Sequence, residues 1–392
     1  MTSRLRGPHR LTAVIGLLFG LALVAGCASK KDRVDPPAEL VKFRETVKVN
    51  RVWTAKVGGA DLKLRLGLGV AVLGDRAFAA GHDGGVTAYA LQTGKQLWHT
   101  KTRVKIAGGP GAGEGVVVVG ATYGDIVALD AATGAIKWKT RVNGEILSAP
   151  TIGADRVLVR SVDGRLHGLN LADGKAVWSA EQQVPKLSLR GAAIPAVAGD
   201  LAVSGFDNGR VMAVTLRDGT TAWEVTIAPP SGRTELERLV DIDSAVRVAD
   251  EDLFAVTYQG RVARVARDTG QIWWAHDISS YRGLTLDDEA VYISTSDGQV
   301  VKIARRTGVE MWRQDVLKNR RLSAPAVVNG EVAVADLKGY VHFLDAATGA
   351  LTARVSTGSK RVSNPPAVAG DIVLFMNDAG HLSAFRVAGH KG

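Results

Sequence analysis

The stretch Ala128-Leu129-Asp130-Ala131-Ala132-Thr133-Gly134-Ala135-Ile136-Lys137-Trp138 contains a Thr-Gly turn followed four residues later by a tryptophan. The turn recurs along the chain as Thr93-Gly94, Thr133-Gly134, Asp173-Gly174, Asp218-Gly219, Thr269-Gly270, Thr307-Gly308 and Thr348-Gly349. Six of the seven turns carry the later tryptophan, and each is preceded ten residues earlier by another glycine. The spacing of roughly 38–51 residues is typical of propeller repeats.

One repeat contains several short strands. In residues 148–178, apolar and β-branched runs at 149–152, 156–160 and 166–169 precede Trp178, and turns separate them. Two of these turns are Asp-Gly pairs, which suit tight hairpins because glycine adopts a positive φ without a Cβ clash. Four strands per repeat predict a β-propeller in which the tryptophans have a structural role.

Both ends of the chain contribute to the predicted number of blades. Residues 365–385 form the first part of another repeat but stop before any Thr-Gly turn or tryptophan. Residues 52–57 supply the missing strand, including Trp53. We therefore predict an all-β fold, an eight-bladed β-propeller of four-stranded antiparallel blades, closed by the N-terminal strand. Closure removes two exposed sheet edges.

The N-terminus precedes this fold. Arg4, Arg6 and Arg10 are followed by an uncharged apolar run that ends at Cys27, the single cysteine of the chain. The run is short for a membrane span, which needs about 20 residues, and is typical of a signal peptide. Val24-Ala25-Gly26-Cys27 resembles a bacterial lipoprotein signal, which implies lipidation of Cys27 and outer-membrane sorting. The alternative is an ordinary secretory signal with an unpaired cysteine.

These observations predict four segments. They are a signal peptide at 1–26, a lipidated flexible tether at 27–43, the propeller at 44–388 and a tail at 389–392. Loss of Arg4, Arg6 and Arg10 lowers the formal charge from +10 to +7. The remaining basic residues are scattered without interleaved aromatic residues, so we expect no nucleic-acid binding.

The repeat resembles the pyrroloquinoline-quinone (PQQ) propeller family, whose Ala-Leu-Asp-x-x-Thr-Gly-x-x-x-Trp pattern residues 128–138 match. Enzymes of that family bind the quinone and calcium, and many use a vicinal cysteine pair. This propeller has no cysteine and lacks long insertions between blades. The histidines are far apart, and His167 and His342 share a repeat position that we expect on a strand surface. We therefore predict no catalytic residues, no metal site, no cofactor and no enzymatic activity.

The repeat is interrupted most strongly at two consecutive connectors. From each tryptophan to the next repeat's first glycine the gaps are 26, 26, 31, 37, 24 and 27 residues, and the two longest follow Trp178 and Trp223. Adjacent blades place equivalent connectors side by side, so these insertions predict one raised patch. Its candidate partner-binding residues combine apolar anchors with charges, as protein-binding hot spots do. They are Leu187, Leu189, Arg190, Asp241 and Asp243.

The lipoprotein signal, the propeller, Leu187-Ser188-Leu189-Arg190-Gly191 and residues 234–243 together resemble the BamB family of outer-membrane protein assembly lipoproteins. The resemblance implies a non-enzymatic scaffold of the β-barrel assembly machinery, lipid-anchored at the periplasmic face of the outer membrane. It implies binding to a periplasmic POTRA domain of BamA through those five residues. It also implies association with the other Bam lipoproteins and contact with nascent outer-membrane proteins.

Two other functions remain open on sequence alone. One is a small, membrane-anchored PQQ-dependent dehydrogenase-like protein. The other is a cell-envelope lipoprotein that binds peptidoglycan or another carbohydrate. Ala353, at the position of the last repeat's tryptophan, departs from the repeat but lies outside the predicted patch.

Overall fold

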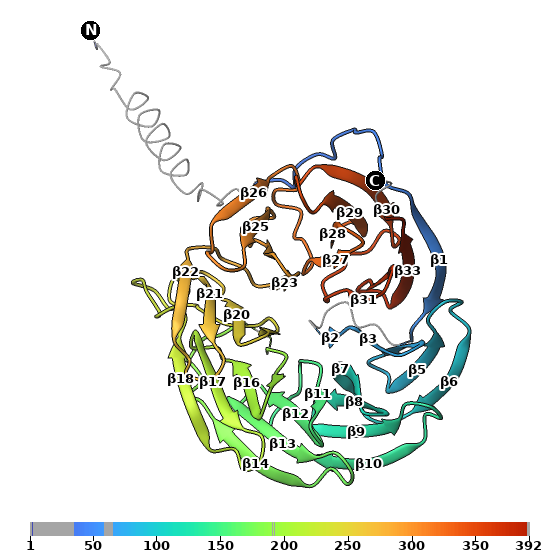
Figure 1. Ribbon diagram of the computed structural model, residues 1–392, viewed down its shortest axis with the longest axis vertical. Coiled ribbons are helices and arrows are strands. Elements are labelled where there is room, and N and C mark those ends of the chain that lie inside the picture. Colours follow the sequence, from blue (N-terminus) through green and yellow to red (C-terminus); the bar gives the residue numbers. More distant parts are fainter. Residues whose placement is uncertain (1, 3–34, 59–65, 190, 192, 390–392) are drawn as a thin grey trace. The chain divides into compact units, whose positions relative to one another are not determined.

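The computed structural model describes residue 2 and residues 35–58, 66–189, 191 and 193–389. Cys27, Arg190 and the predicted signal peptide apart from residue 2 lie outside the described residues. Eight antiparallel sheets are arranged around a central axis, each with its strands ordered from the axis outwards (Figure 1). This confirms the predicted all-β, eight-bladed propeller.

The first four blades in chain order are four-stranded units, with one short additional strand. Blade 1 contains β3 (Val70–Leu73), β4 (Arg76–Ala80), β5 (Gly85–Ala90) and β6 (Gln96–Lys101). Blade 2 contains β7 (Ile106–Gly113), β8 (Val116–Ala121), β9 (Asp125–Asp130) and β10 (Ile136–Arg141), and β2 (Gly67–Leu68) joins β7 in parallel. Blade 3 contains β11 (Thr151–Gly153), β12 (Arg156–Ser161), β13 (Arg165–Asn170) and β14 (Ala176–Glu181). Blade 4 contains β15 (Ala196–Ala198), β16 (Leu201–Gly205), β17 (Arg210–Thr215) and β18 (Thr221–Thr226).

The remaining blades complete the ring. Blade 5 contains β19 (Arg247–Ala249), β20 (Asp252–Val256), β21 (Val262–Ala266) and β22 (Ile272–His276). Blade 6 contains β23 (Leu284–Leu286), β24 (Ala290–Ser294), β25 (Val300–Ala304) and β26 (Glu310–Gln314). Blade 7 contains β27 (Ala326–Val328), β28 (Glu331–Ala335), β29 (Tyr340–Asp345) and β30 (Leu351–Ser356). Blade 8 contains β31 (Ala367–Ala369), β32 (Ile372–Met376), β33 (His381–Val387) and the N-terminal strand β1 (Val49–Lys56).

The repeated tryptophans join neighbouring blades. The ring of Trp138 packs so closely on Gly174 of the next blade that a Cβ there would lie 2.4 Å from the indole. The indole Nε1 also donates a hydrogen bond to the main-chain carbonyl of Leu171, at 2.8 Å. Glycine is required at position 174 both for this contact and for its φ of +72°.

The same indole-to-carbonyl bond occurs at seven blade boundaries, at 2.7–3.2 Å. The pairs are Trp53–Leu91, Trp98–Ala131, Trp138–Leu171, Trp178–Leu216, Trp223–Arg267, Trp274–Arg305 and Trp312–Ala346.

The eighth boundary, between blades 7 and 8, is built differently. Here Ala353 stands where the other repeats have tryptophan. In blade 8 no turn links the third strand to the outer strand, because the outer strand is the N-terminal β1. The two ends of the propeller meet at this place, and Ala388 N donates a hydrogen bond to Lys48 O. Val47 is buried at this boundary with Ala353 and Phe385. Strand β1 then pairs along β33, from Val49 to Lys56, which confirms closure by the N-terminal strand.

Part of the segment predicted as tether contacts the propeller. Ala38 forms two hydrogen bonds with the connector that follows blade 6. Its N–H donates to the carbonyl of Lys318 at 2.9 Å, and its carbonyl accepts from the guanidinium of Arg320 at 2.7 Å. Arg354 of β30 donates to the carbonyl of Val41 at 3.1 Å and lies 4.9 Å from the centre of the Phe43 ring. Contacts with the propeller therefore begin before residue 44.

The prediction that His167 and His342 lie on a strand surface is wrong. Both side chains are buried, and His342 Nε2 lies 3.1 Å from the carboxylate of Asp336, which also pairs with Arg320 at 2.6 Å. Burial lowers the pKa of both histidines, to about 4 for His167. Their shared repeat position reflects an inward-facing site in the third strand of each blade.

Candidate docking surface on the connector face

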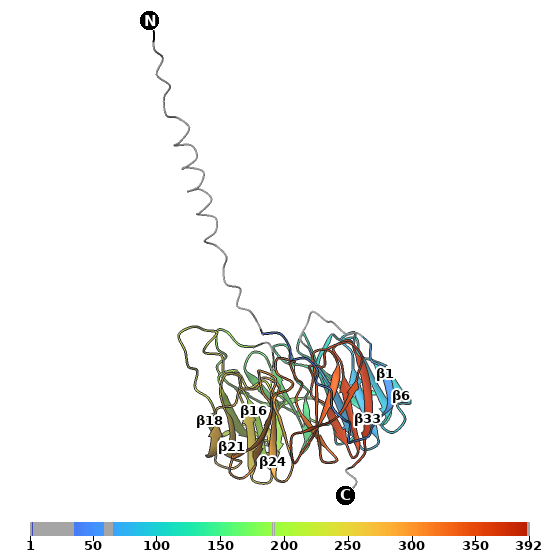
Figure 2. The ribbon, with the colours of Figure 1, turned by 90° about the horizontal axis from the view of Figure 1, so that it is seen from above.

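The two longest connectors lie on one face of the propeller. We call this end the connector face, because here the outer strand of each blade leads to the inner strand of the next. Residues 182–195 join β14 to β15, and residues 227–246 join β18 to β19. Figure 2 shows the propeller edge-on, with the connector beside β18 extending beyond the ends of the strands. The two long connectors are thus neighbours on one face, as the predicted raised patch requires.

A direct bond joins these two connectors. The main-chain N–H of Leu189 donates to the carboxylate of Asp241, which is fully buried. Gly191 approaches Asp243 so closely that a Cβ at position 191 would lie 2.8 Å from the Asp243 carboxyl carbon. The two aspartates, predicted as surface acceptors for a partner, therefore contact the neighbouring connector in this structure. Their geometry suits positioning the 187–191 segment.

Buried charge underlies this contact. Arg160 of β12 is 1% exposed, its Nη2 lies 3.5 Å from Oδ1 of Asp207, and its guanidinium packs 4.3 Å from the centre of the Phe206 ring. Burial raises the pKa of Asp207, although the attraction of Arg160 opposes the shift. Burial also raises the pKa of Asp241 to about 7, despite the Leu189 bond, and repulsion from Asp207 adds to the increase. A neutral carboxyl at Asp241 suits this crowded acidic environment.

The leucines of the predicted patch differ in exposure. Leu187 is 39% exposed, whereas Leu189 is partly buried and lines the central cavity. Sequence reasoning missed Leu236, which is 65% exposed at the tip of the second connector. We define the docking surface as Leu187, Leu189 and Leu236 on these two connectors.

A local signal for Leu236 was present in the sequence. Thr234 and Glu237 form a capping box around it, in which Glu237 accepts from the N–H groups of Arg233 and Thr234 at 2.6 and 3.1 Å. Thr234 Oγ1 accepts in return from Glu237 N at 3.2 Å. The motif fixes a single turn, and an apolar residue inside a fixed, exposed turn is a candidate contact.

The described residues contain no group of three or more His, Cys, Asp or Glu side chains arranged to hold a metal ion. Nor does any helix among them have the length and apolar character needed to cross a membrane.

The repeat and the indole contacts define the class as a PQQ-type β-propeller. Residues 44–105, 82–314 and 296–390 match the family described as outer membrane protein assembly factor BamB. The BamB of Pseudomonas aeruginosa is 43% identical over 371 residues, covering 94% of this chain and 98% of the relative. The BamB of Bordetella pertussis is 36% identical over 375 residues, covering 94% and 96%. This chain belongs to the BamB family, the non-enzymatic outer membrane protein assembly factors of the β-barrel assembly machinery.

Solved structures agree. The crystal structure of BamB from Moraxella catarrhalis matches with a TM-score of 0.79 at 30% identity, covering 86% of this chain and all of that one. Quinohemoprotein alcohol dehydrogenase from Comamonas testosteroni matches with a TM-score of 0.68 at 13% identity, covering 88% of this chain and 77% of that one. The second likeness concerns the fold alone.

Proposed function

We propose that this assembly factor acts as a scaffold that binds the periplasmic POTRA region of BamA through the docking surface. The observation that carries the proposal is the bond from Leu189 N to Asp241, which joins the two longest connectors of adjacent blades. Leu187 and Leu236, which belong to the two connectors joined by this bond, are 39% and 65% exposed. Exposed apolar anchors on a rigid base are typical of hot spots.

In this proposal the five family residues have two roles. Leu187, Leu189 and Arg190 contact the partner directly, and Leu236 extends their surface. Asp241 and Asp243 position the first connector from below, since Asp241 is buried and bonded to Leu189. Lipidation of Cys27 would hold the protein at the periplasmic face of the outer membrane, where BamA, the other Bam lipoproteins and nascent outer-membrane proteins meet.

A titration with the isolated POTRA domains of BamA tests this proposal. We expect Leu187→Ala, Leu236→Ala and a Leu189→Ala/Arg190→Ala double variant each to weaken binding by roughly 1–4 kcal/mol. Leu97→Ala is the matched control, because Leu97 is 42% exposed on β6 of another blade. Its affinity should equal that of the parent.

A melting curve for each variant separates a loss of binding from a loss of folding. We expect unchanged curves, because the substitutions leave the blade cores intact. Unchanged affinity of the Leu189→Ala/Arg190→Ala variant, with binding by the parent intact, would exclude this surface as the POTRA site.

A further inference from the structure

A cavity of about 490 Å³ opens on the axis of the propeller at the connector face. Connectors and inner strands from blades around the ring line it, including Leu147, Ile194, Arg247, Arg282 and Asn364. Its volume lies within the range of small-molecule sites, about 300–1,000 Å³. Because the wall comes from many blades, the closed ring holds its shape without any partner.

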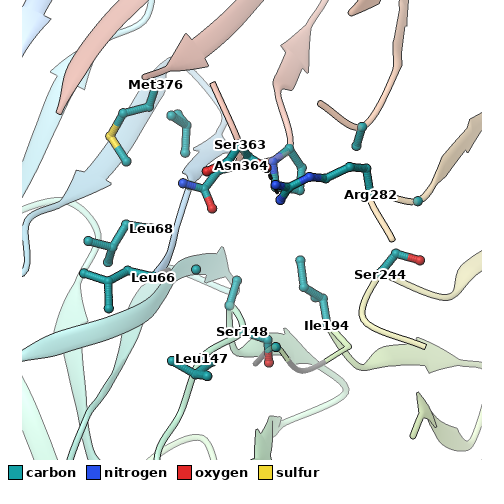
Figure 3. Close-up of a pocket in the computed structure, with 18 of the residues that line it drawn as sticks. Leu66, Leu68, Leu147, Ser148, Ile194, Ser244, Arg282, Ser363, Asn364 and Met376 are labelled. Atoms are coloured by element: carbon teal, nitrogen blue, oxygen red, sulfur yellow. Dashed lines mark hydrogen bonds between the residues drawn. The ribbon is translucent and has the colours of Figure 1, made fainter. Parts of the chain in front are cut away.

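The lining has two chemically different sides. Figure 3 shows Arg282, Ser363 and Asn364 gathered on one side, and Leu66, Leu68, Leu147 and Ile194 on the other, with Ser148 and Ser244 among them. The Arg282 guanidinium donates to Ser363 O at 2.9 Å and packs 5.0 Å from the centre of the Tyr281 ring, so its position is fixed. An apolar wall that faces a few fixed polar groups is the usual composition of a small-molecule site.

Arg247 is the most informative residue of the lining. Its Nε donates to the main-chain carbonyl of Leu284 at 3.3 Å, which ties β19 to β23 beside the cavity. No carboxylate forms an ion pair with Arg247 among the residues that the structure describes. Burial alone lowers the pKa of its guanidinium, with no neighbouring acid to offset the effect. Arg247 is partly buried, and a partly desolvated cation with no ion-paired carboxylate among the described residues would be stabilised by an anion in the cavity.

Acidic side chains in the lining do not supply that counter-charge. Asp378 already accepts from the main-chain N–H and the hydroxyl of Ser363, at 3.1 and 2.6 Å. Asp243 lies against the first connector, and burial with repulsion from Asp241 and Asp207 raises its pKa well above the ordinary value, although the attraction of Arg160 and Arg282 opposes the shift. Asp378 is thus engaged by Ser363, and Asp243 is attracted by Arg160 and Arg282, whereas Arg247 forms no ion pair with a carboxylate of the described residues.

We propose that the central cavity binds an organic anion that carries a carboxylate on an apolar group. Arg247 and Arg282 would bind the carboxylate, because a planar guanidinium matches its two oxygens. The apolar group would pack on Leu66, Leu147 and Ile194. A free carboxylic acid and the C-terminus of an apolar peptide share this chemistry. Binding here requires no contact with BamA, although Leu189 of the docking surface also lines the cavity.

Calorimetric titration of the purified protein tests this inference. We expect saturable one-to-one binding of octanoate and no binding of octanamide, which has the same chain without the charge. N-acetyl-Leu-Phe with a free or an amidated C-terminus tests the peptide source: only the free form should bind. Tighter binding of the peptide would identify a chain end as the natural ligand, and tighter binding of octanoate would identify a free acid.

Arg247→Gln should weaken octanoate binding by about tenfold or more, because one charged hydrogen-bond donor is lost. Arg217→Gln is the matched control, since Arg217 is exposed, pairs with its neighbour Asp218 and does not belong to the cavity lining, and the affinity of this variant should not change. Equal binding of octanamide, unchanged affinity in Arg247→Gln or no saturable binding of any acid would overturn the proposal. If Arg247→Gln does not fold, crystals of the parent protein with 8-bromooctanoate provide the test, because anomalous scattering locates the bromine. Bromine in the cavity supports the site, and bromine found only elsewhere refutes it.

Discussion

At the scale of single residues, Asp241 links the electrostatics of the docking surface to its geometry. Its carboxyl is buried, accepts a bond from Leu189 and has a pKa of about 7. The ordinary value, 3.8, applies to the unfolded chain. The folded protein therefore holds this proton over a range in which the unfolded chain has lost it. The associated stability is full below about pH 4 and is lost as the pH rises through about 7.

This behaviour can be tested with Asp241→Asn, which removes the ionisable group but keeps an acceptor for Leu189. We expect the fall in unfolding free energy between pH 4.5 and 7.5 to be smaller in this variant than in the parent. Urea unfolding at several pH values measures it. Asp288→Asn is the control, because Asp288 is exposed and should leave the pH dependence unchanged. A pH dependence in Asp241→Asn equal to that of the parent would contradict the assignment.

At the scale of elements, the blade boundaries depend on a repeated contact and on one exception. Seven boundaries share a tryptophan that packs on a glycine turn and donates to a carbonyl. At the eighth boundary the chain itself enters the ring, and Val47 occupies the position beside Ala353. In the other blades the tryptophan packs on the glycine turn between the third and outer strands of the next blade. Blade 8 has no such turn, because its outer strand is the N-terminal β1. The absence of a tryptophan at Ala353 and the absence of the turn therefore have one cause.

Trp53 is the best test of ring closure, because it lies on β1 and bonds to Leu91 of blade 1 at 2.7 Å. Trp53→Ala removes a buried indole from the strand that completes blade 8. We expect it to lower the free energy of unfolding by about 3–5 kcal/mol. Chemical denaturation with intrinsic fluorescence measures the change.

Trp273→Ala provides the comparison for this variant. Trp273 is 51% exposed on β22 and contacts no neighbouring blade through a repeat glycine. Its removal should cost much less than that of Trp53. Equal stability of Trp53→Ala and the parent would show that the N-terminal strand adds little to the ring.

At the scale of the whole molecule, the connector face of the propeller carries both the docking surface and the mouth of the central cavity. The docking surface lies on the connector from blade 3 to blade 4 and on the connector from blade 4 to blade 5, and the cavity opens on the axis. The two sites meet at Leu189 and Asp243, which belong to the first and second connectors and also line the cavity. Occupancy of the cavity and the position of the first connector therefore share residues, although each proposal has its own test.

The predicted membrane attachment through Cys27 belongs to this scale, because an anchor would determine where the whole propeller can act. Cys27→Ser should move the protein from the membrane to the periplasmic fraction, or leave an uncleaved precursor. The physical reason is that each buried CH₂ of an acyl chain contributes about 0.8 kcal/mol to membrane binding. Fractionation and intact-mass analysis measure both outcomes. A mature native N-terminus without acyl chains would rule out the predicted anchor.

The repeat alone was enough to predict the blades, their number and the strand that closes the ring. The prediction succeeded because hairpin turns and strand alternation are local, and a copied unit repeats its local signals. Comparison of connector lengths also placed the two insertions side by side, since equivalent connectors of adjacent blades occupy one face. The capping box around Leu236 was equally local, and its significance was overlooked.

Only the tertiary structure decided which way the functional side chains face. Asp241 turns inward to Leu189, although aspartate is usually exposed, and His342 is buried beside Asp336, although histidine is of intermediate burial on average. Such burial depends on compensating groups from distant segments, which no local pattern encodes. The same holds for Arg247, whose bond to the carbonyl of Leu284 forms only when blades 5 and 6 meet beside the axis. The sequence thus determined the ring and its two long connectors. Long-range packing determined which polar and charged side chains face the interior of the propeller.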